Sequence, residues 1–463
     1  MNPELETADS AAELVEEVRR PISDKERSGA VRHLLAGLGK RQHMIAWGGV
    51  LARFFAVQLL VQVGTGFAGI AIIRLLTKPE FAWYSVATSL MFAATALSDC
   101  GVGVALTALG GKVWQDGEAL GSLISSALSI RRWFVAIVVA GIGIVVPLLL
   151  HRDHAPLLQS LSVAGTVILS ILVQFSISLY GVVPRLRANY SLLQNSTMAS
   201  IGVRLCLIGI LYLCYANATT AMLANAAGFG IQLWLYRRFA AEQVNLHASI
   251  RKDMVSEILG IVRKQVPYEL YGAISGQLSI LLISLFGNSG RVAEVGALGR
   301  LAMILTATSG VVTNVLVPRF ARCQDPKRLL SLFWKILLLY SCVLSAVLLA
   351  CGVFPHQVVS VLGQNYANMG GECFLAVTGA VVGALMTAVW SLNISRGWIV
   401  PAWIGIGLGI AAQAFGIALF DIRTVHGILL MTLLLNSVGV VLHLIASAYF
   451  FRANGFDAVV STE

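Results

Sequence analysis

Six charged side chains interrupt long apolar segments of the sequence. They are four arginines and two acids: Arg53, Arg74, Arg204, Arg300, Asp99 and Glu269. A charge among apolar residues costs free energy, so each such residue is a candidate for binding or ion transfer. Arginine presents a planar fork of N–H donors that matches phosphate oxygens, whereas a carboxylate can bind a proton or a sodium ion. We therefore predict that the arginines bind an anionic ligand and that the acids bind a proton or a sodium ion.

Each arginine also has a simpler explanation. Arg53 and Arg74 lie near the ends of one apolar segment, from which a long side chain can extend to the lipid headgroups. Arg300 could form an ion pair with Glu294 instead of facing a cavity. Arg204 lies two to three turns inside its segment, where it could either face a cavity or pack against a neighbouring helix. Arg300 is the strongest candidate for the substrate-binding cavity.

The two acids have comparable alternatives. Glu269 shares a helical face with Gln265, Gly272 and Gly276, because their spacings are four, three and four residues. It could bind a proton or sodium, pair with an arginine, or anchor a helix at the inner interface. Asp99 is followed by two glycines within four residues, so a helix cap or a kink is the alternative to ion coupling.

Polar side chains line one face of the first apolar segment. Gln58, Gln62 and Thr65 are spaced by four and three residues, which places them together on a helix. Gln58 and Gln62 could face a water-filled cavity, or they could bond to a neighbouring helix. The sequence leaves both interpretations open.

The segments that hold these residues are apolar enough to cross a membrane. Of the 463 residues 57% are hydrophobic and 12% are charged, and the mean hydropathy is +0.79. A spanning helix needs about 20 residues, and in lipid its backbone must satisfy its own hydrogen bonds. We therefore predict an all-α polytopic membrane protein of about twelve transmembrane helices. They are expected at 48–75, 82–110, 133–150, 156–182, 195–215, 218–236, 264–287, 293–317, 331–352, 371–392, 398–420 and 427–450.

Lysines and arginines between these segments set the expected orientation. Most of the 33 Lys and Arg residues, Arg131 among them, fall on one set of loops, and positive loops stay in the cytoplasm. The opposite loops hold Lys78, Arg152, Arg291 and Arg423. Both termini are therefore predicted to be cytoplasmic. Trp83 and Tyr84 fall at an outer helix end, where interfacial aromatic residues are common, so neither is assigned a function.

The longest connection between apolar segments divides the chain into two sets of six helices. The predicted organisation is a cytoplasmic polar tail at 1–45, an N-terminal bundle at 46–240, a cytoplasmic linker at 241–262, a C-terminal bundle at 263–452 and a tail at 453–463. The first 45 residues are polar and charged, so no leader peptide is expected. Two halves of six helices have the same orientation in the membrane.

Several functions are disfavoured by composition and motifs. The net charge is +10, but the basic residues lie between apolar segments rather than on one soluble face, so nucleic acid is not an expected partner. The seven cysteines form no CxxC pair, and neither a metal site nor another cofactor is predicted. The sequence has no Walker phosphate-binding loop, so a sodium or proton gradient is a more suitable energy source than ATP.

Three stretches resemble the polysaccharide transporters of the multidrug/oligosaccharidyl-lipid/polysaccharide exporter superfamily, which includes the O-antigen flippases. They are Ile73–Tyr84 (IRLLTKPEFAWY), Leu97–Leu106 (LSDCGVGVAL), and Gln265–Tyr268 (QVPY) together with Val295–Leu301 (VGALGRL). The chain departs from the family pattern at three places. Ala82 replaces a glycine, Val295 replaces a tyrosine, and Ser279–Leu281 stands where many members have an acid.

The resemblance implies a V-shaped pair of six-helix bundles around a central cavity, working by alternating access. It implies a flippase that moves an undecaprenyl-pyrophosphate-linked oligosaccharide across the bacterial inner membrane. The product would be a surface polysaccharide such as O-antigen lipopolysaccharide, capsule or exopolysaccharide. Membrane lipids, glycosyltransferases and a polysaccharide polymerase are the expected partners.

Three other functions compete with this one. A drug or cation antiporter of the same superfamily would need a cavity for cations, which arginines disfavour. A membrane polymerase or glycosyltransferase would need catalytic acids or bases, but the longest outer loop, about 352–370, contains His356 and no acid. A structural scaffold would not explain charges inside apolar segments. We therefore expect a transporter that breaks no covalent bond.

Overall fold

The computed structural model describes residues 60–453, apart from short gaps at 188, 214–215, 247, 313–315, 324 and 399. Regular secondary structure in the described chain is helical throughout. The tail at 1–45, Arg53 and Gln58 precede Leu60, so the predictions made for them lie outside the described residues. The same holds for the C-terminal tail beyond Ala453.

Eight described helices precede the connection near residue 247. They are Leu60–Leu75, α3 (Lys78–Asp99), α4 (Val102–Val113), α5 (Gly117–Arg152), α6 (Leu157–Tyr180), α7 (Val182–Leu186), α8 (Tyr190–Leu213) and α9 (Ala218–Gln243). The helices that follow are α10 (Lys252–Ser275), α11 (Leu278–Phe286), α12 (Ser289–Val311), α13 (Val317–Arg322), α14 (Pro326–Val353), α15 (Pro355–Ser360), η2 (Gln364–Tyr366), α16 (Gly370–Ser395), α17 (Ala402–Leu419) and α18 (Val425–Ala453).

Many of these helices can span a membrane. In the described residues seven helices are long and apolar enough, and the bent pair Glu269–Ser275 and Leu278–Phe286 makes an eighth candidate. Each of the twelve predicted segments overlaps at least one described helix. Apolar side chains such as Leu158 (82% exposed) and Trp403 (77% exposed) point outward, as expected for a surface that contacts lipid. The prediction of an all-α polytopic membrane protein is therefore confirmed.

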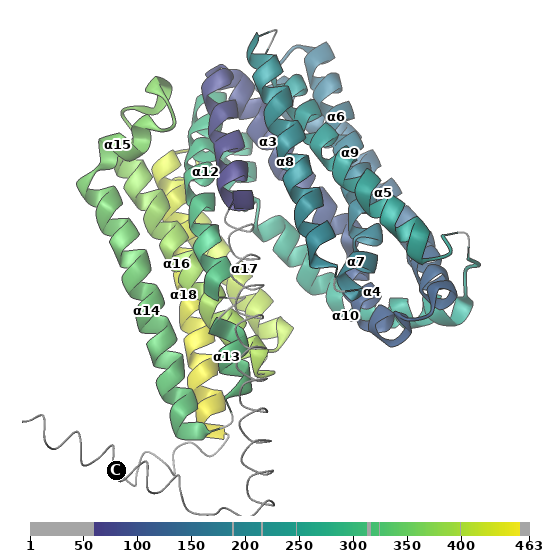
Figure 1. Cartoon of the computed structure of the whole chain (residues 1–463). Helices are drawn as coiled ribbons and strands as arrows, with labels where there is room; N and C mark the ends of the chain where they lie inside the picture. Colours follow the sequence, from purple (N-terminus) through teal and green to yellow (C-terminus); the bar gives the residue numbers. More distant parts are fainter. Residues whose placement is uncertain are drawn as a thin grey trace, which may run out of the picture. The chain divides into compact units, whose positions relative to one another are not determined.

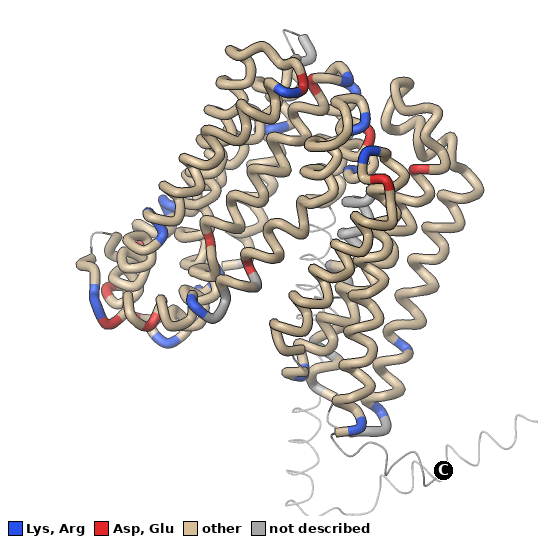
Figure 2. The backbone as a smooth tube through the Cα atoms, turned by 180° about the vertical axis from the view of Figure 1, so that it is seen from behind, with Lys and Arg blue, Asp and Glu red and all other residues tan. Residues whose placement is uncertain are grey.

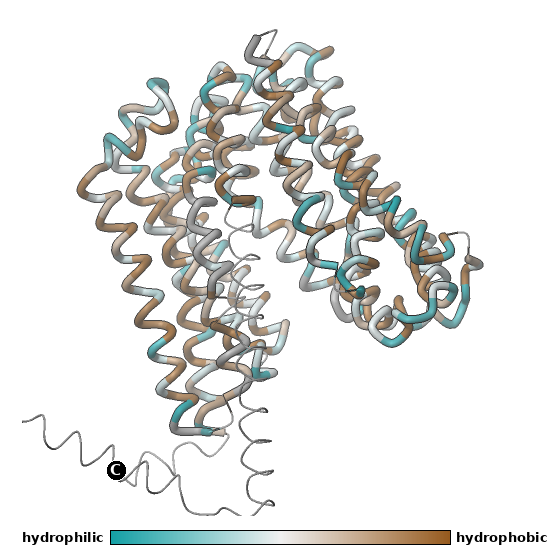
Figure 3. The backbone as a smooth tube through the Cα atoms, viewed as in Figure 1, coloured by the Kyte–Doolittle hydropathy of each residue, from teal (hydrophilic) through white to brown (hydrophobic). Residues whose placement is uncertain are grey.

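Charge and hydropathy follow the helices in the way a bilayer requires. Figure 2 shows that Lys, Arg, Asp and Glu gather near the helix ends, with long uncharged stretches between them. Figure 3 shows apolar residues recurring along the full length of helices such as α14 and α18. A helix with this distribution satisfies its backbone internally and leaves few polar groups in the hydrocarbon region.

Packing between helices is closest within each part of the chain. Helices α5, α6, α8 and α9 pack side by side, as do α14, α16, α17 and α18 (Figure 1). Further contacts join the parts: α11 and α12 pack on α3, and α10 packs on α3, α4 and α5. The linker predicted at 241–262 is partly helical, because α9 continues to Gln243 and α10 begins at Lys252.

Three helices differ from their predicted course. The second segment is two helices, α3 and α4, separated by Cys100 (φ 45°) and Gly101 (φ 80°), which both have left-handed backbone. The seventh segment bends by 50° between α10 and α11. The third helix, α5, begins at Gly117 instead of 133, because the side chain of Asp116 caps its first N–H groups. Hydropathy detects the part of a helix in lipid, not its polar extension.

Candidate functional site

A partly open cavity of about 290 Å³ lies among α3, α11, α12, α16 and α18. Its polar lining consists of Ser85, Thr88, Ser89, Gln277, Ser279, Arg300, Thr432 and Asn436. Arg300 is the one charged residue among the described residues that line it. A cavity that combines apolar walls with a few polar side chains is typical of a small-ligand site.

Arg300 extends from α12 toward α3. Its Nη2 atom donates to Thr88 Oγ1 at 3.5 Å, and its Cζ atom lies 5.8 Å from the centre of the Tyr84 ring. A guanidinium over a tyrosine ring is attracted by the negative face of that ring. The alternative partner considered from the sequence, Glu294, forms its ion pair with Lys78, where Nζ and Oε1 are 2.5 Å apart.

Tyr84 connects Arg300 with the second candidate arginine. The Tyr84 side chain is 1% exposed, and its hydroxyl accepts a hydrogen bond from Asn225 Nδ2 at 3.0 Å. Arg204 of α8 also interacts with this hydroxyl and is close enough to Arg300 for their charges to repel. The structure therefore brings Arg204 and Arg300, two of the predicted substrate-binding residues, to one tyrosine.

Sequence analysis missed two members of this group. Tyr84 was expected among the interfacial aromatic residues, without a function, but its side chain is buried where α3 packs between other helices. Asn225 of α9 was not considered, since a lone asparagine in an apolar segment is usually a packing residue. The available signal was the position of Tyr84 at the end of the Ile73–Tyr84 stretch that resembles the family.

The third predicted arginine, Arg74, lies elsewhere. Its Nε donates to the carbonyl of Val361 at 2.9 Å, and its Nη2 donates to that of Ser360 at 3.0 Å. These carbonyls belong to the last residue and the C-cap of the short helix α15, and a cation stabilises such a helix end. Gln62 is half-buried on the same helix as Arg74, outside the cavity lining. The substrate-binding roles of Arg74 and Gln62 stay predictions.

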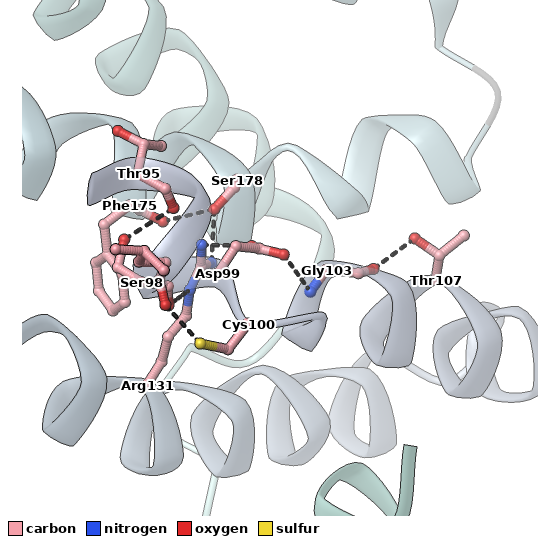
Figure 4. Close-up of polar contacts among 10 residues, drawn as sticks. Thr95, Ser98, Asp99, Cys100, Gly103, Thr107, Arg131, Phe175 and Ser178 are labelled. Carbon is pink, nitrogen blue, oxygen red and sulfur yellow. Dashed lines mark hydrogen bonds and ion pairs between the residues drawn. The ribbon is translucent and has the colours of Figure 1, made fainter. Parts of the chain in front are cut away.

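A second polar cluster surrounds a buried arginine (Figure 4). Arg131 is 0% exposed, and its guanidinium forms an ion pair with Asp99. Its Nε donates to the carbonyl of Ser98 at 3.1 Å, and its Nη1 donates to Ser178 Oγ at 2.5 Å. Its Cζ lies 4.8 Å from the centre of the Phe175 ring. The cluster therefore joins α3, α5 and α6.

Asp99 has two structural contacts and one acidic neighbour. Besides Arg131, it accepts a hydrogen bond from the Gly103 N–H at 3.2 Å, which caps α4. Glu269 of α10 lies close enough for electrostatic interaction with Asp99. Within the described part of the chain no cation forms an ion pair with Glu269. The structure thus places the two predicted ion-coupling acids near each other, with Asp99 paired to Arg131.

Arg131 was interpreted from the sequence as a loop residue. That interpretation is wrong because α5 starts at Gly117, which puts Arg131 fifteen positions into a continuous helix. The run of serines and small apolar residues before it contains no helix-breaking proline. In the described residues no group of three His, Cys, Asp or Glu side chains could hold a metal ion.

The fold matches solved structures of membrane transporters. An inward-facing multidrug resistance MATE family transporter of the MOP superfamily has a TM-score of 0.68 at 12% identity, covering 88% of this chain and 99% of that one. An outward-facing MATE family transporter has a TM-score of 0.60 at 12% identity, with coverages of 86% and 93%. A MOP superfamily transporter from Pyrococcus furiosus has a TM-score of 0.52 at 12% identity, with coverages of 87% and 95%.

These similarities define the class: the chain has the fold of a multi-pass helical transporter of the MOP superfamily. A family model described as polysaccharide biosynthesis protein matches residues 54–324, which is more than half of the sequence, and the chain belongs to that family. No curated protein sequence matches the chain. The resemblance stated from the sequence is therefore confirmed at the level of the family, and the fold agrees with that of solved MOP superfamily transporters.

Proposed function

We propose that the protein is a flippase that moves an undecaprenyl-pyrophosphate-linked oligosaccharide across the bacterial inner membrane. The observation that carries the proposal is the pair Arg300 and Arg204 at Tyr84, with Arg300 in the wall of the cavity. Two guanidinium groups in a water-poor site attract an anionic group such as a pyrophosphate. Membership of a polysaccharide biosynthesis family supports a glycan cargo.

The cavity lining suits the junction between phosphate and sugar. Arg300 supplies the cation, while Gln277, Ser279, Thr432 and Asn436 supply hydroxyl and amide groups that can bond to sugar hydroxyls. A volume of about 290 Å³ accommodates the pyrophosphate and the nearest sugar rather than a whole lipid-linked oligosaccharide. The lipid tail and the distal sugars would extend beyond this cavity.

The remaining parts of the proposal concern orientation, partners and energy. The distribution of Lys and Arg supports cytoplasmic termini, so the cargo would move outward for O-antigen, capsule or exopolysaccharide synthesis. Glycosyltransferases would supply the lipid-linked cargo and a polymerase would consume it. Glu269 is the proposed site of coupling to a proton or sodium gradient, with Asp99 beside it. No covalent chemistry is proposed for any residue.

A drug or cation antiporter is the second candidate, because the structural neighbours include multidrug resistance transporters. Charge separates the two candidates. For the neighbour from Pyrococcus furiosus, reverse polarity of the binding pocket suggests a different function, so pocket charge can vary on this fold. The described cavity lining here contains Arg300 and no acid, which favours an anionic cargo.

Arg300→Ala tests the cargo assignment in a host whose surface polysaccharide depends on this chain. The variant should abolish export, because it removes the cation that lines the cavity, while Arg300→Lys should retain part of it. Surface polysaccharide is measured by immunoblot, and the amount of protein in the membrane is measured in the same cells. Normal surface polysaccharide in the Arg300→Ala strain would contradict the assignment. If the wild-type chain gives its host drug resistance but does not restore surface polysaccharide, the result would support the antiporter function.

A further inference from the structure

Asn225 places a neutral amide beside a buried cation. It lies on α9 and is 5% exposed, and its Nδ2 donates to the Tyr84 hydroxyl at 3.0 Å. Arg204 interacts with the same hydroxyl, and Arg300 lies over the ring. One tyrosine thus contacts an amide and two guanidinium groups, each from a different helix. An aspartate differs from asparagine by one group of atoms and would fit the same space.

Arg204 is electrostatically incomplete in this arrangement. Its Nε is buried and has no hydrogen-bond partner among the described residues. In the same part of the chain no carboxylate forms an ion pair with Arg204, and the nearby charge of Arg300 repels it. A buried charge is costly unless it is paired. An anion supplied from outside the chain would provide the missing partner.

We propose that Asn225 is a specificity-determining residue, whose neutral amide keeps the Arg204–Tyr84–Arg300 group open to a phosphate-bearing ligand. The inference rests on the proposed function and adds the residue that sets the charge preference of its site. Asn225 acts through Arg204 and Tyr84 rather than as a ligand for the cargo. A carboxylate at this position would accept the Tyr84 hydroxyl proton in a hydrogen bond, neutralise Arg204 and compete with the phosphate.

Two variants of Asn225 should change ligand binding and stability in different ways. Asn225→Asp gives Arg204 an internal counter-ion, so the folded state without ligand should become more stable while phosphate binding weakens. Asn225→Leu removes the same amide without adding charge, so it should lower stability and leave most of the phosphate affinity. A purely structural asparagine would lower both quantities in both variants.

The test uses the purified full chain in detergent, titrated with farnesyl pyrophosphate, inorganic pyrophosphate and farnesol. Binding is followed by tryptophan fluorescence, and stability by the midpoint of thermal unfolding without ligand. Asn225→Asp should weaken both pyrophosphates by more than about tenfold, as expected when a charge-assisted contact is lost. Asn225→Leu should weaken them by less than about threefold. Farnesol, which has no phosphate, should bind all variants equally, and Asn225→Asp should melt no lower than the wild type.

Three results would overturn the proposal. They are pyrophosphate affinity of Asn225→Asp within about twofold of the wild type, equal losses in the Asp and Leu variants, and no pyrophosphate binding by the wild type. Comparing the affinities for farnesyl pyrophosphate and inorganic pyrophosphate separates the contribution of the lipid to binding from that of the phosphates. If Asn225→Asp loses pyrophosphate as expected while the export assay shows no polysaccharide cargo, the inference stands and the proposed flippase function fails.

Discussion

Two buried arginines of this protein, Arg131 and Arg204, differ in the partners that their charges have. Arg131 is fully enclosed, and its guanidinium contacts the Asp99 carboxylate, the Ser178 hydroxyl and the Ser98 carbonyl. Arg204 has a buried Nε without a hydrogen-bond partner in the described chain. Arg131 is paired with a carboxylate and holds helices together, whereas Arg204 has no carboxylate partner among the described residues and is available to an anionic ligand. The same residue type therefore serves structure at one position and, as we propose, binding at the other.

The Asp99–Arg131 pair predicts a large stability difference between two neighbouring acids. Asp99→Asn leaves the buried Arg131 charge unpaired and should cost about 3 kcal/mol. Glu269→Gln should cost less than about 1 kcal/mol, because no described cation pairs with Glu269. The midpoint of thermal unfolding in detergent reports both effects. The double variant Asp99→Leu with Arg131→Met should recover part of the loss, and equal destabilisation by the two single acid variants would refute this account.

At the scale of helices, the break between α3 and α4 determines where Asp99 lies. Cys100 and Gly101 both have positive φ, so the chain turns there and the Asp99 side chain can cap α4 while it contacts Arg131. The sequence predicts a continuous helix over 82–110, because hydropathy does not change at the break. The glycines after Asp99 indicated a cap or kink, but they could not show which helix it would contact.

Gly101→Ala tests this break. At φ 80° an added Cβ crowds the following carbonyl, which costs about 1–2 kcal/mol. Gly111→Ala inside α4 is the matched control, because an added Cβ there meets nothing within 4 Å and alanine favours the helix by about 0.5–1 kcal/mol. The two variants should therefore shift the unfolding midpoint in opposite directions. A stabilising Gly101→Ala would show that the turn is not needed.

Across the whole molecule, sequence predicts elements better than it predicts contacts between them. Twelve apolar segments and the candidates Arg204, Arg300, Asp99 and Glu269 could be found, because apolar length and buried charge are local properties. That Arg204 and Arg300 meet at Tyr84 depends on packing among α3, α8, α9 and α12. No spacing within one helix carries that information.

One surface of contact joins the early and late helices of the chain. Arg74 donates to carbonyls at the C-terminal end of α15, and Lys78 at the start of α3 pairs with Glu294 of α12. Lys78 Nζ also lies 5.8 Å from the centre of the Tyr366 ring, whose hydroxyl has its pKa raised by burial. Two turns further along α3, this helix approaches α12 closely enough that a Cβ added at Gly296 would lie 2.8 Å from Ser85 Cβ.

If transport requires α3 and α12 to separate, a covalent link at this approach should stop it. Ser85→Cys with Gly296→Cys would place two Cβ atoms near the 3.5–4.5 Å that a disulfide requires, after a small shift of the helices. In a background without the seven native cysteines, oxidation should link the two helices and abolish export of polysaccharide, and a reductant should restore it. Each single cysteine variant under the same oxidant is the control. Undiminished export by the fully linked protein would mean that these helices stay together throughout the cycle, because a disulfide allows no separation of more than a few ångströms.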